Sequence, residues 1–296
     1  MMSKGVLMYA HNNPEIDYIK IACANALMVQ RNLHVPVTLV TDNGSLAWCK
    51  ESVGDELVAQ CFEKIIIVDI DSEFNNKRSY GDTSFSTKTL QFYNCNHWAA
   101  YDLSPYDETL FIDADYLIMS DSLSNCWGSQ SDVMINYHIF DTVSNRVPYF
   151  KYIDEFGIRQ YWATVIYFNK STFSKYLFDL VRHIQENYTY FRDLYYFSNG
   201  MYRNDNAFSV ALHMLNGYTD SNFSTGELPI PGMLMSWDRD DIYEISGVND
   251  ITIYAEQPTP GKYILLRLKN QDVHIMNKWA INRHADTLIN LYKDLA

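Results

Sequence analysis

With 296 residues, the chain is long enough to bury a sizeable core, either in one large α/β domain or in two small ones. Its net charge of -13 argues against broad, non-specific nucleic-acid binding, which depends on Lys and Arg side chains that neutralise phosphates, although it leaves room for a local basic site. The five cysteines form an odd set without a Cys-x-x-Cys pair, which favours reduced thiols over a disulfide framework or a cysteine-ligated zinc. No apolar run is long enough for a signal peptide or a membrane-spanning helix, so we expect a cytoplasmic protein that does not enter a membrane.

The N-terminal part predicts strands that alternate with helices. An apolar run at 6–10 ends at His11, and helical spacing follows over 15–31, with Asn13 as the expected N-cap and Pro14 in the first turn. Two more strands are expected at 35–40 and 64–70. Alternation of this kind predicts a mostly parallel sheet flanked by helices, with the loops after its strands at one edge.

The segment 88–101, KTLQFYNCNHWAAY, is expected to form a helix. Lys88 would then lie in the first turn, where the helix dipole disfavours a cation. It is either a solvated surface lysine or a lysine that faces an anion.

The stretch Asp107–Asn125, DETLFIDADYLIMSDSLSN, is the one that carries a chemical motif. Asp-x-Asp tripeptides begin at Asp69, Asp113 and Asp238, so the tripeptide alone means little. Only the middle one, with Asp113 and Asp115, has apolar runs on both sides. Two carboxylates at the end of a buried strand are costly unless they are paired or bound to a cation, which indicates a ligand site at this sheet edge.

The second half predicts strands at 132–137 and 161–168 and helices at 171–187 and 204–216. Between the helices, 188–202 is dense in aromatic residues, which form either a packed subdomain or a platform on which a sugar or base stacks. Asp205 lies in the first turn of the last helix, where an acid is ordinary capping, so any catalytic role needs support from elsewhere.

Positive charge concentrates near the C-terminus. Two strands are expected within 262–277, and 261–283 holds five Lys or Arg against one acid, Asp272. Within this segment His274 and Lys278 lie four positions apart. It is the one place in the sequence with a credible anion site.

Together, Asp113, Asp115 and His274 would suit Mn²⁺ or Mg²⁺, which prefers oxygen ligands and takes further ligands from phosphates. Lys278 would supply a point charge for a phosphate oxygen. A site of this kind stabilises a diphosphate as it leaves, which points to glycosyl transfer from a nucleotide diphosphate sugar.

The order of these segments resembles the GT-A glycosyltransferases, most closely glycosyltransferase family 8, the glycogenin and galactosyltransferase group. The matching segments are GVLMYA, VPVTLVTD, FEKIIIVDI, the stretch from STKTLQ to IMSDSL, YWATVIYFN, RNDNAFSVALHMLNG and DVHIMNKWA. The resemblance implies one GT-A, Rossmann-like nucleotide-sugar-binding domain over 1–296, with a nucleotide-binding half at 1–125 and an acceptor-side half at 126–296. It also implies transfer with retention from a donor of the UDP-sugar type.

The resemblance also implies roles for individual residues. Asp113 and Asp115 would bind metal and nucleotide sugar, with His274 as the third protein ligand. Lys278 would contact the diphosphate, Lys88 the donor sugar or phosphate, and Asp205 the donor sugar. Asp205 would be the general base if the reaction inverted. The residues expected near the nucleotide are Tyr9, Ala10, His11 and Asp42.

The acceptor stays open. The family commonly has Asn-x-Gly or Ser-Gly where this chain has Ala163 and Thr164, and it spaces the final His and Lys further apart. Two segments, YAHNNPEIDYIKIA and RNDNAFSVALHMLNG, also resemble glycosyltransferase-like proteins of tailed bacteriophages. Some phage enzymes of this activity glycosylate hydroxymethylated DNA bases. A glycan and a modified DNA base are therefore both candidates. The alternative to an enzyme is a GT-A protein that binds a nucleotide sugar without turnover.

Overall fold

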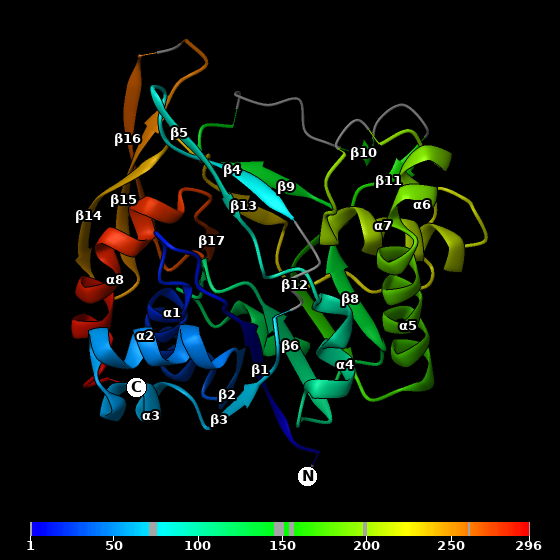
Figure 1. Cartoon of the computed structure of the whole chain (residues 1–296), viewed down its shortest axis with the longest axis horizontal. Coiled ribbons are helices and arrows are strands. Elements are labelled where there is room, and N and C mark those ends of the chain that lie inside the picture. Colours follow the sequence, from blue (N-terminus) through cyan, green and yellow to red (C-terminus); the bar gives the residue numbers. More distant parts are fainter. Residues whose placement is uncertain are drawn as a thin grey trace.

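Figure 1 shows the computed structural model of the chain. It describes residues 2–70, 76–144, 151–153, 157–197, 200–259 and 261–295. The second acid of the Asp69/Asp71 pair lies outside these residues. Among the helices described, none combines the length and the apolar character that crossing a bilayer requires.

A six-stranded sheet forms the centre of the molecule, in the order β3-β2-β1-β6-β12-β8. Its first four members are parallel, and β12 runs antiparallel to both of its neighbours. The bounds are β1 Lys4–Tyr9, β2 Val37–Thr41, β3 Lys64–Ile67, β6 Glu108–Ile112, β8 Val133–Asn136 and β12 Trp162–Asn169. The prediction of an α/β fold with a mainly parallel central sheet is confirmed.

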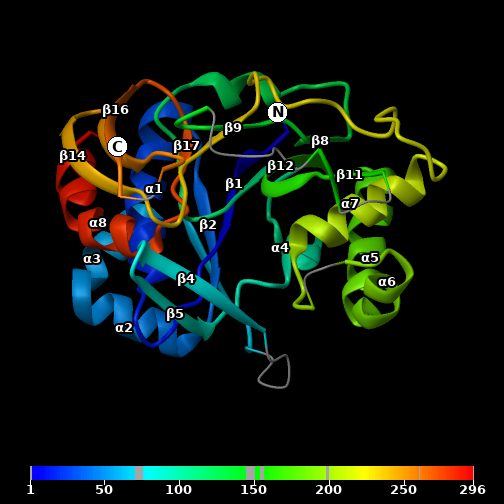
Figure 2. The ribbon, with the colours of Figure 1, turned by 90° about the horizontal axis from the view of Figure 1, so that it is seen from above.

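Helices cover this sheet in two groups, which Figure 2 shows on opposite sides of the molecule. The first group comprises α1 Tyr18–Leu33, α2 Asn43–Val53, α3 Asp55–Cys61 and α8 Lys278–Tyr292. The second comprises α4 Ala100–Leu103, α5 Thr172–Glu186, α6 Tyr188–Leu194 and α7 Asn204–Leu215. The predicted helices at 171–187 and 204–216 are confirmed, and Ser171 caps α5 as its side chain accepts from Ser174 N. The carboxyl ends of the parallel strands are left for the loops.

The start of α1 differs from the prediction. Its N-cap is Asp17, whose side chain accepts from Lys20 N, whereas Asn13 Oδ1 accepts from the backbone N–H groups of Glu15 and Ile16. Asn13 therefore closes a local turn four residues before the helix, a competing use of a short amide side chain. At the end of β2, Asp42 caps α2 directly, so the expected loop is already a helix start.

The predicted helix over 88–101 is wrong. Residues Ser86–Gln91 form β5, which pairs antiparallel with β4, Lys77–Thr83, and Lys88 lies opposite Tyr80. Helical structure begins only at the short η1, His97–Ala99, and continues into α4. Figure 1 shows the β4–β5 hairpin extending beyond the central sheet toward the C-terminal strands.

A second sheet, in the order β7-β17-β13-β9, joins segments that are far apart in the sequence. Its bounds are β7 Tyr116–Leu117, β9 Ile139–Asp141, β13 Met233–Met235 and β17 Val273–His274. A third sheet contains β14 Asp241–Gly247, β15 Asp250–Glu256 and β16 Tyr263–Lys269. The remaining short elements are η2 Ser122–Cys126, β10 Tyr152–Ile153 and β11 Ile158–Arg159. The two strands expected within 262–277 are β16 and β17.

Candidate active site

Two carboxylates and an imidazole converge beyond the carboxyl end of β6. One ligand atom from each of Asp113, Asp115 and His274 lies within 4.8 Å of the other two. Asp113 is the first residue after β6, and its backbone N–H donates to Thr164 O at 2.9 Å. The two carboxylates thus lie just beyond the carboxyl end of a parallel strand, where open α/β sheets commonly bind their ligands.

The pairing of β7 with β17 brings His274 to this place. His274 lies opposite Tyr116 in the antiparallel register, and Ile275 N donates to Asp115 O at 3.0 Å. Because β7 follows Asp115 immediately, the ladder fixes the imidazole beside the carboxylate, with 3.4 Å between His274 Nε2 and Asp115 Oδ1. A two-residue strand therefore joins positions 159 residues apart, from Asp115 to His274.

The two carboxylates have opposite electrostatic settings. Asp115 is buried and forms an ion pair with Lys278, whose ammonium also donates to Ile275 O at 3.1 Å. Burial alone would raise the pKa of Asp115, but Lys278 and His274 outweigh it and lower that pKa. Burial, with the charges of Asp115 and Asp205 nearby, raises the pKa of Asp113 well above its usual range.

The cluster fits a divalent cation. Its donors are two carboxylates and one imidazole, a set that suits Mn²⁺ or Mg²⁺ with further ligands from phosphates. The raised pKa of Asp113 shows that negative charge at this position is not fully compensated by the described residues. His274 Nδ1 is buried and has no hydrogen-bond partner in the part of the chain that the structure describes. A bound cation would offset the negative charge around Asp113. It would also take one of the two ring nitrogens of His274 as a ligand.

Residues at the ends of β1 and β2 form the adjoining wall. Thr41 Oγ1 donates to Ala10 O at 2.6 Å, and His11 Nδ1 lies 3.1 Å from Asp42 Oδ2. Burial would raise the pKa of Asp42, but its contacts with His11 and Ser45 lower that pKa. The Asp42 carboxylate is thus already used in capping α2 and in its contact with His11.

An aromatic cavity of about 320 Å³ opens beside this wall. Tyr9 and His11 line it together with Phe92, Tyr93 and Trp98. A mostly apolar, aromatic lining with a few polar groups is typical of small-molecule sites and suits a flat ring system. The structure therefore places Tyr9 and His11 on a cavity, and Ala10 and Asp42 in the wall next to it.

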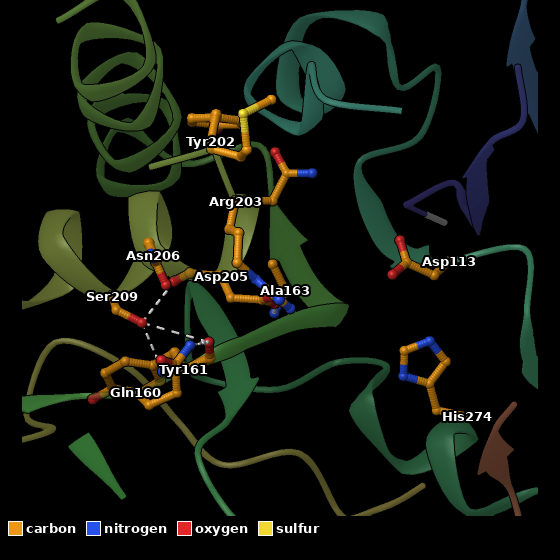
Figure 3. A network of polar contacts seen from close by, with 12 residues as sticks. Asp113, Gln160, Tyr161, Ala163, Tyr202, Arg203, Asp205, Asn206, Ser209 and His274 are labelled. Atoms are coloured by element: carbon orange, nitrogen blue, oxygen red, sulfur yellow. Dashed lines mark hydrogen bonds and ion pairs between the residues drawn. The ribbon is translucent and has the colours of Figure 1, made fainter. Parts of the chain in front are cut away.

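Asp205 approaches the cluster from the other group of helices. It lies in the first turn of α7, where its carboxylate accepts from Ala163 N at 2.9 Å and from Arg203 at 3.1 Å. Burial would raise its pKa, but Arg203, the Ala163 N–H and Arg78 lower it, so the group is held ionised. Figure 3 shows Asp205 and Ala163 across from Asp113 and His274.

Lys88 has a partner of its own. Its ammonium donates to Glu15 Oε2 at 2.7 Å and lies 5.4 Å from the centre of the Trp279 ring, and its side chain is 56% exposed. Lys88 belongs to β5 and not to the first turn of a helix, so its position gives no reason to expect that it faces a ligand anion.

Arg78, on β4, is a cation that no sequence motif singles out. It is half-buried, its guanidinium carbon lies 3.5 Å from the centre of the Phe92 ring, and among the described residues it forms no ion pair. Its charge opposes the rise in the pKa of Asp113 that burial and the neighbouring carboxylates cause, and it contributes to the lowered pKa of Asp205. No motif surrounds it, and only the folding of the β4–β5 hairpin brings it toward the carboxylates.

His97 is a second residue near the cluster that no sequence motif indicates. It is buried, its ring lies 4.4 Å from that of Phe111, and its Nε2 lies 3.6 Å from Asp113 Oδ1. Burial lowers the pKa of His97 to about 3, so the ring is neutral near pH 7. It is a core histidine that also borders Asp113 of the carboxylate and imidazole cluster.

The basic C-terminal segment is largely neutralised within the fold. Arg267 pairs with Asp250, and Arg283 pairs with both Asp82 and Asp241. Lys278 pairs with Asp115, as described above. Of the five cations, only Lys262 and Lys269 have no ion pair among the residues with described positions. The local surplus of positive charge in the sequence is therefore not an open anion-binding surface.

Comparison with known proteins gives no family. No family model matches the chain, and no curated protein matches it. The structure is similar to the glycosyltransferase GlyE of Streptococcus pneumoniae TIGR4, with 15% identity over 76% of this chain and 45% of that one, at a TM-score of 0.40. It is also similar to galactosyltransferase LgtC in complex with donor and acceptor sugar analogues, with 14% identity over 70% of each chain, at a TM-score of 0.43.

A third similar structure is the PaToxG glycosyltransferase, with 10% identity over 74% of this chain and 72% of that chain, at a TM-score of 0.39. The chain spans less than half the length of the GlyE chain that it matches. Likenesses at these values show nothing about the activity of this chain.

Proposed function

We propose that this chain is a metal-dependent glycosyltransferase of GT-A type that transfers a sugar from a nucleotide diphosphate sugar to a hydroxyl acceptor. The observation that carries the proposal is the meeting of Asp113, Asp115 and His274 at the carboxyl end of a parallel strand, beside an aromatic cavity. In this proposal those three residues hold Mn²⁺ or Mg²⁺, which when bound supplies a Lewis acid for the departing diphosphate.

The aromatic cavity beside Tyr9 and His11 would hold the nucleoside of the donor, which we propose to be a UDP-sugar. Its volume of about 320 Å³ accommodates a base with part of the ribose, and its rings offer stacking surfaces. The diphosphate would then extend toward the Asp113, Asp115 and His274 cluster, since Tyr9 lines the cavity, its ring lies 5.9 Å from that of His97, and His97 Nε2 lies 3.6 Å from Asp113 Oδ1.

Two cations of the chain would share the diphosphate. Lys278 already neutralises Asp115, and Arg78 adds a guanidinium without an ion pair among the described residues. A planar guanidinium offers paired donors to phosphate oxygens, which an ammonium cannot do. We therefore assign to Arg78 the contact with the donor that the sequence had suggested for Lys88.

In the reaction, the bond between the anomeric carbon and the diphosphate oxygen breaks, and the electron pair leaves with the diphosphate. The acceptor hydroxyl oxygen forms the new bond to that carbon, and its proton passes to the departing diphosphate oxygen. Asp205, held ionised by Arg203 and the Ala163 N–H, would orient the donor sugar by accepting from its hydroxyls. In this scheme the acceptor oxygen approaches the face of the sugar from which the diphosphate departs, so the configuration is retained and no general base is required.

The test is release of nucleoside diphosphate from a panel of UDP-sugars with and without Mn²⁺, in the absence of an acceptor. A glycosyltransferase of this kind hydrolyses its donor slowly, so we expect metal-dependent UDP release from at least one sugar. A protein that only binds a nucleotide sugar would show Mn²⁺-dependent UDP binding by calorimetry and no release from any member of the panel. That result would contradict the proposed enzyme and favour a protein that binds a nucleotide sugar without turnover.

A further inference from the structure

A second cavity, of about 470 Å³, lies where α5 gives way to α6. The segments that precede β4 and α7 complete its wall, and the residues that matter here are Asn76, Gln185, Glu186, Tyr188, Tyr190 and Tyr202. We call it the tyrosine pocket. None of its described lining residues belongs to the metal cluster or to the aromatic cavity.

The tyrosine pocket shares a wall with the aromatic cavity of the candidate active site. Gln185 Nε2 donates to Cys95 O at 3.3 Å and to Asn96 Oδ1 at 3.2 Å, and Cys95 and Asn96 line the aromatic cavity from the other side. Asn76 stands two residues before Arg78, and its Nδ2 donates to Tyr202 O at 3.2 Å. Figure 3 shows Tyr202 leading through Arg203 to Asp205.

The chemistry of the tyrosine pocket suits a neutral, polyhydroxylated ligand. Tyrosine rings provide faces for the C–H surface of a sugar ring, and amide side chains pair with neighbouring hydroxyls as donor and acceptor. Asn76 is 2% exposed, and its Oδ1 has no hydrogen-bond partner among the described residues, so one acceptor is left unused at this wall. An unused buried acceptor is costly unless a ligand or water meets it.

The charges exclude a polyanion from the same place. Glu186 is the one charged residue among the described lining residues, and a carboxylate repels phosphate. Nucleic-acid binding draws most of its free energy from Lys and Arg contacts to phosphates. The basic C-terminal segment offers few such contacts, because Arg267 and Arg283 are paired with acids and Lys278 faces Asp115, which leaves only Lys262 and Lys269 without an ion pair among the described residues.

We propose that the tyrosine pocket binds the acceptor of the transfer and that this acceptor is a neutral carbohydrate, not a nucleic acid. The inference rests on the proposed glycosyl transfer, since it names the molecule whose hydroxyl oxygen forms the new glycosidic bond. The aromatic run of the sequence then has two uses. Tyr188 and Tyr202 are buried and build the wall, and Tyr190 presents its ring at the mouth with 63% exposure.

The experiment uses saturation-transfer NMR of the whole chain with maltose, cellobiose and lactose as neutral probes. The variant is Tyr190→Ala, and the matched control is Tyr176→Ala, because both tyrosines are 63% exposed on neighbouring helices and only Tyr190 lines the tyrosine pocket. We expect at least one disaccharide to bind, with affinity reduced about 3- to 10-fold by Tyr190→Ala, the range for loss of one aromatic contact. Tyr176→Ala should bind as the unchanged chain does.

A parallel titration follows fluorescence anisotropy of single- and double-stranded DNA that contains hydroxymethylcytosine, at low salt. Disaccharide binding that responds only to Tyr190→Ala, without DNA binding, supports the inference. Absence of binding by all three disaccharides, an equal response to both variants, or DNA binding that Tyr190→Ala weakens would overturn it. Metal-dependent UDP release without an acceptor tests the proposed function separately, so that failure of one claim is told apart from failure of the other.

Discussion

At the scale of single residues, the site depends on how each charge is compensated. Asp115 is balanced by Lys278, whereas Asp113 sits beside a neutral imidazole, His97, and a second carboxylate, Asp205. A cation bound here would therefore gain most from Asp113 and from the imidazole of His274. The pairing with Lys278 holds Asp115 in place, whereas the charge of Asp113 is left for a ligand.

Replacement of His274 by Ala should weaken Mn²⁺ binding by about 10- to 100-fold, because one of three protein donors is lost. The backbone pairing of β17 with β7 does not involve the imidazole, so the fold should persist. A Mn²⁺ titration followed by electron paramagnetic resonance measures the affinity, and far-UV circular dichroism checks the fold. An unchanged titration would remove His274 from the metal site.

The roles of Arg78 and Lys88 in the proposed donor binding can be separated by a pair of variants. Arg78→Ala should lower the affinity for UDP in the presence of Mn²⁺ by about 10-fold or more, the usual effect of losing a charge-assisted hydrogen bond. Lys88→Ala should change it less than about 2-fold, because Lys88 is 56% exposed and paired with Glu15. Calorimetry of UDP binding gives both values, and the reverse order would restore the role suggested for Lys88.

At the scale of elements, a two-residue ladder and one carboxylate hold the segments that carry the Asp113, Asp115 and His274 cluster. Asp272 accepts from the backbone N–H groups of Met119 and Ser120, both at 2.7 Å, and so joins the segment after β7 to the start of β17. Burial raises the pKa of Asp272 to about 6, and its Oδ2 has no described partner. The folded chain therefore holds this carboxyl protonated more readily than the unfolded chain does.

This predicts a destabilising effect of Asp272 as pH rises. Between the ordinary pKa of 3.8 and the folded value of about 6, the folded state binds more protons, so its stability falls as pH rises through that window. The two values correspond to about 2 kcal/mol between pH 4.5 and pH 7.

Asp272→Asn keeps one acceptor oxygen and removes the titration. Its stability relative to the unchanged chain should therefore be about 2 kcal/mol greater at pH 7 than at pH 4.5. Urea unfolding of both proteins at the two pH values measures this difference. A difference that is the same at both values would show that Asp272 does not titrate in this window.

Elements with clear local patterns were predictable from the sequence, and those defined by distant partners were not. Strands β1, β2, β3 and β6 are apolar runs between turn residues, and α5 and α7 have helical spacing with caps. The segment at 88–101 was misassigned because β5 exists through its pairing with β4, and strand formation depends on such neighbours more than on local preference.

At the scale of the whole molecule, the sheet separates two groups of helices, and the candidate site draws on both. Asp113 and Asp115 could be selected from the sequence because apolar runs flank them, and His274 because it lies in a basic segment. Arg78 and His97 could not, since neither has a sequence context that differs from that of a surface arginine or a core histidine. The prediction of an open anion site at 261–283 failed for the same reason. The acids that neutralise this segment, such as Asp82 and Asp250, are remote from it in sequence.

The central claim is that the Asp113, Asp115 and His274 cluster holds a cation that serves cleavage of a nucleotide sugar. Its most direct test is the rate of Mn²⁺-dependent UDP release from the best donor of the panel, for the unchanged chain and for Asp115→Asn. We expect the rate to fall at least about 100-fold, because the variant replaces a charged metal ligand by a neutral one and removes the charge that pairs with Lys278. Mn²⁺-dependent release at the same rate in Asp115→Asn would contradict the account.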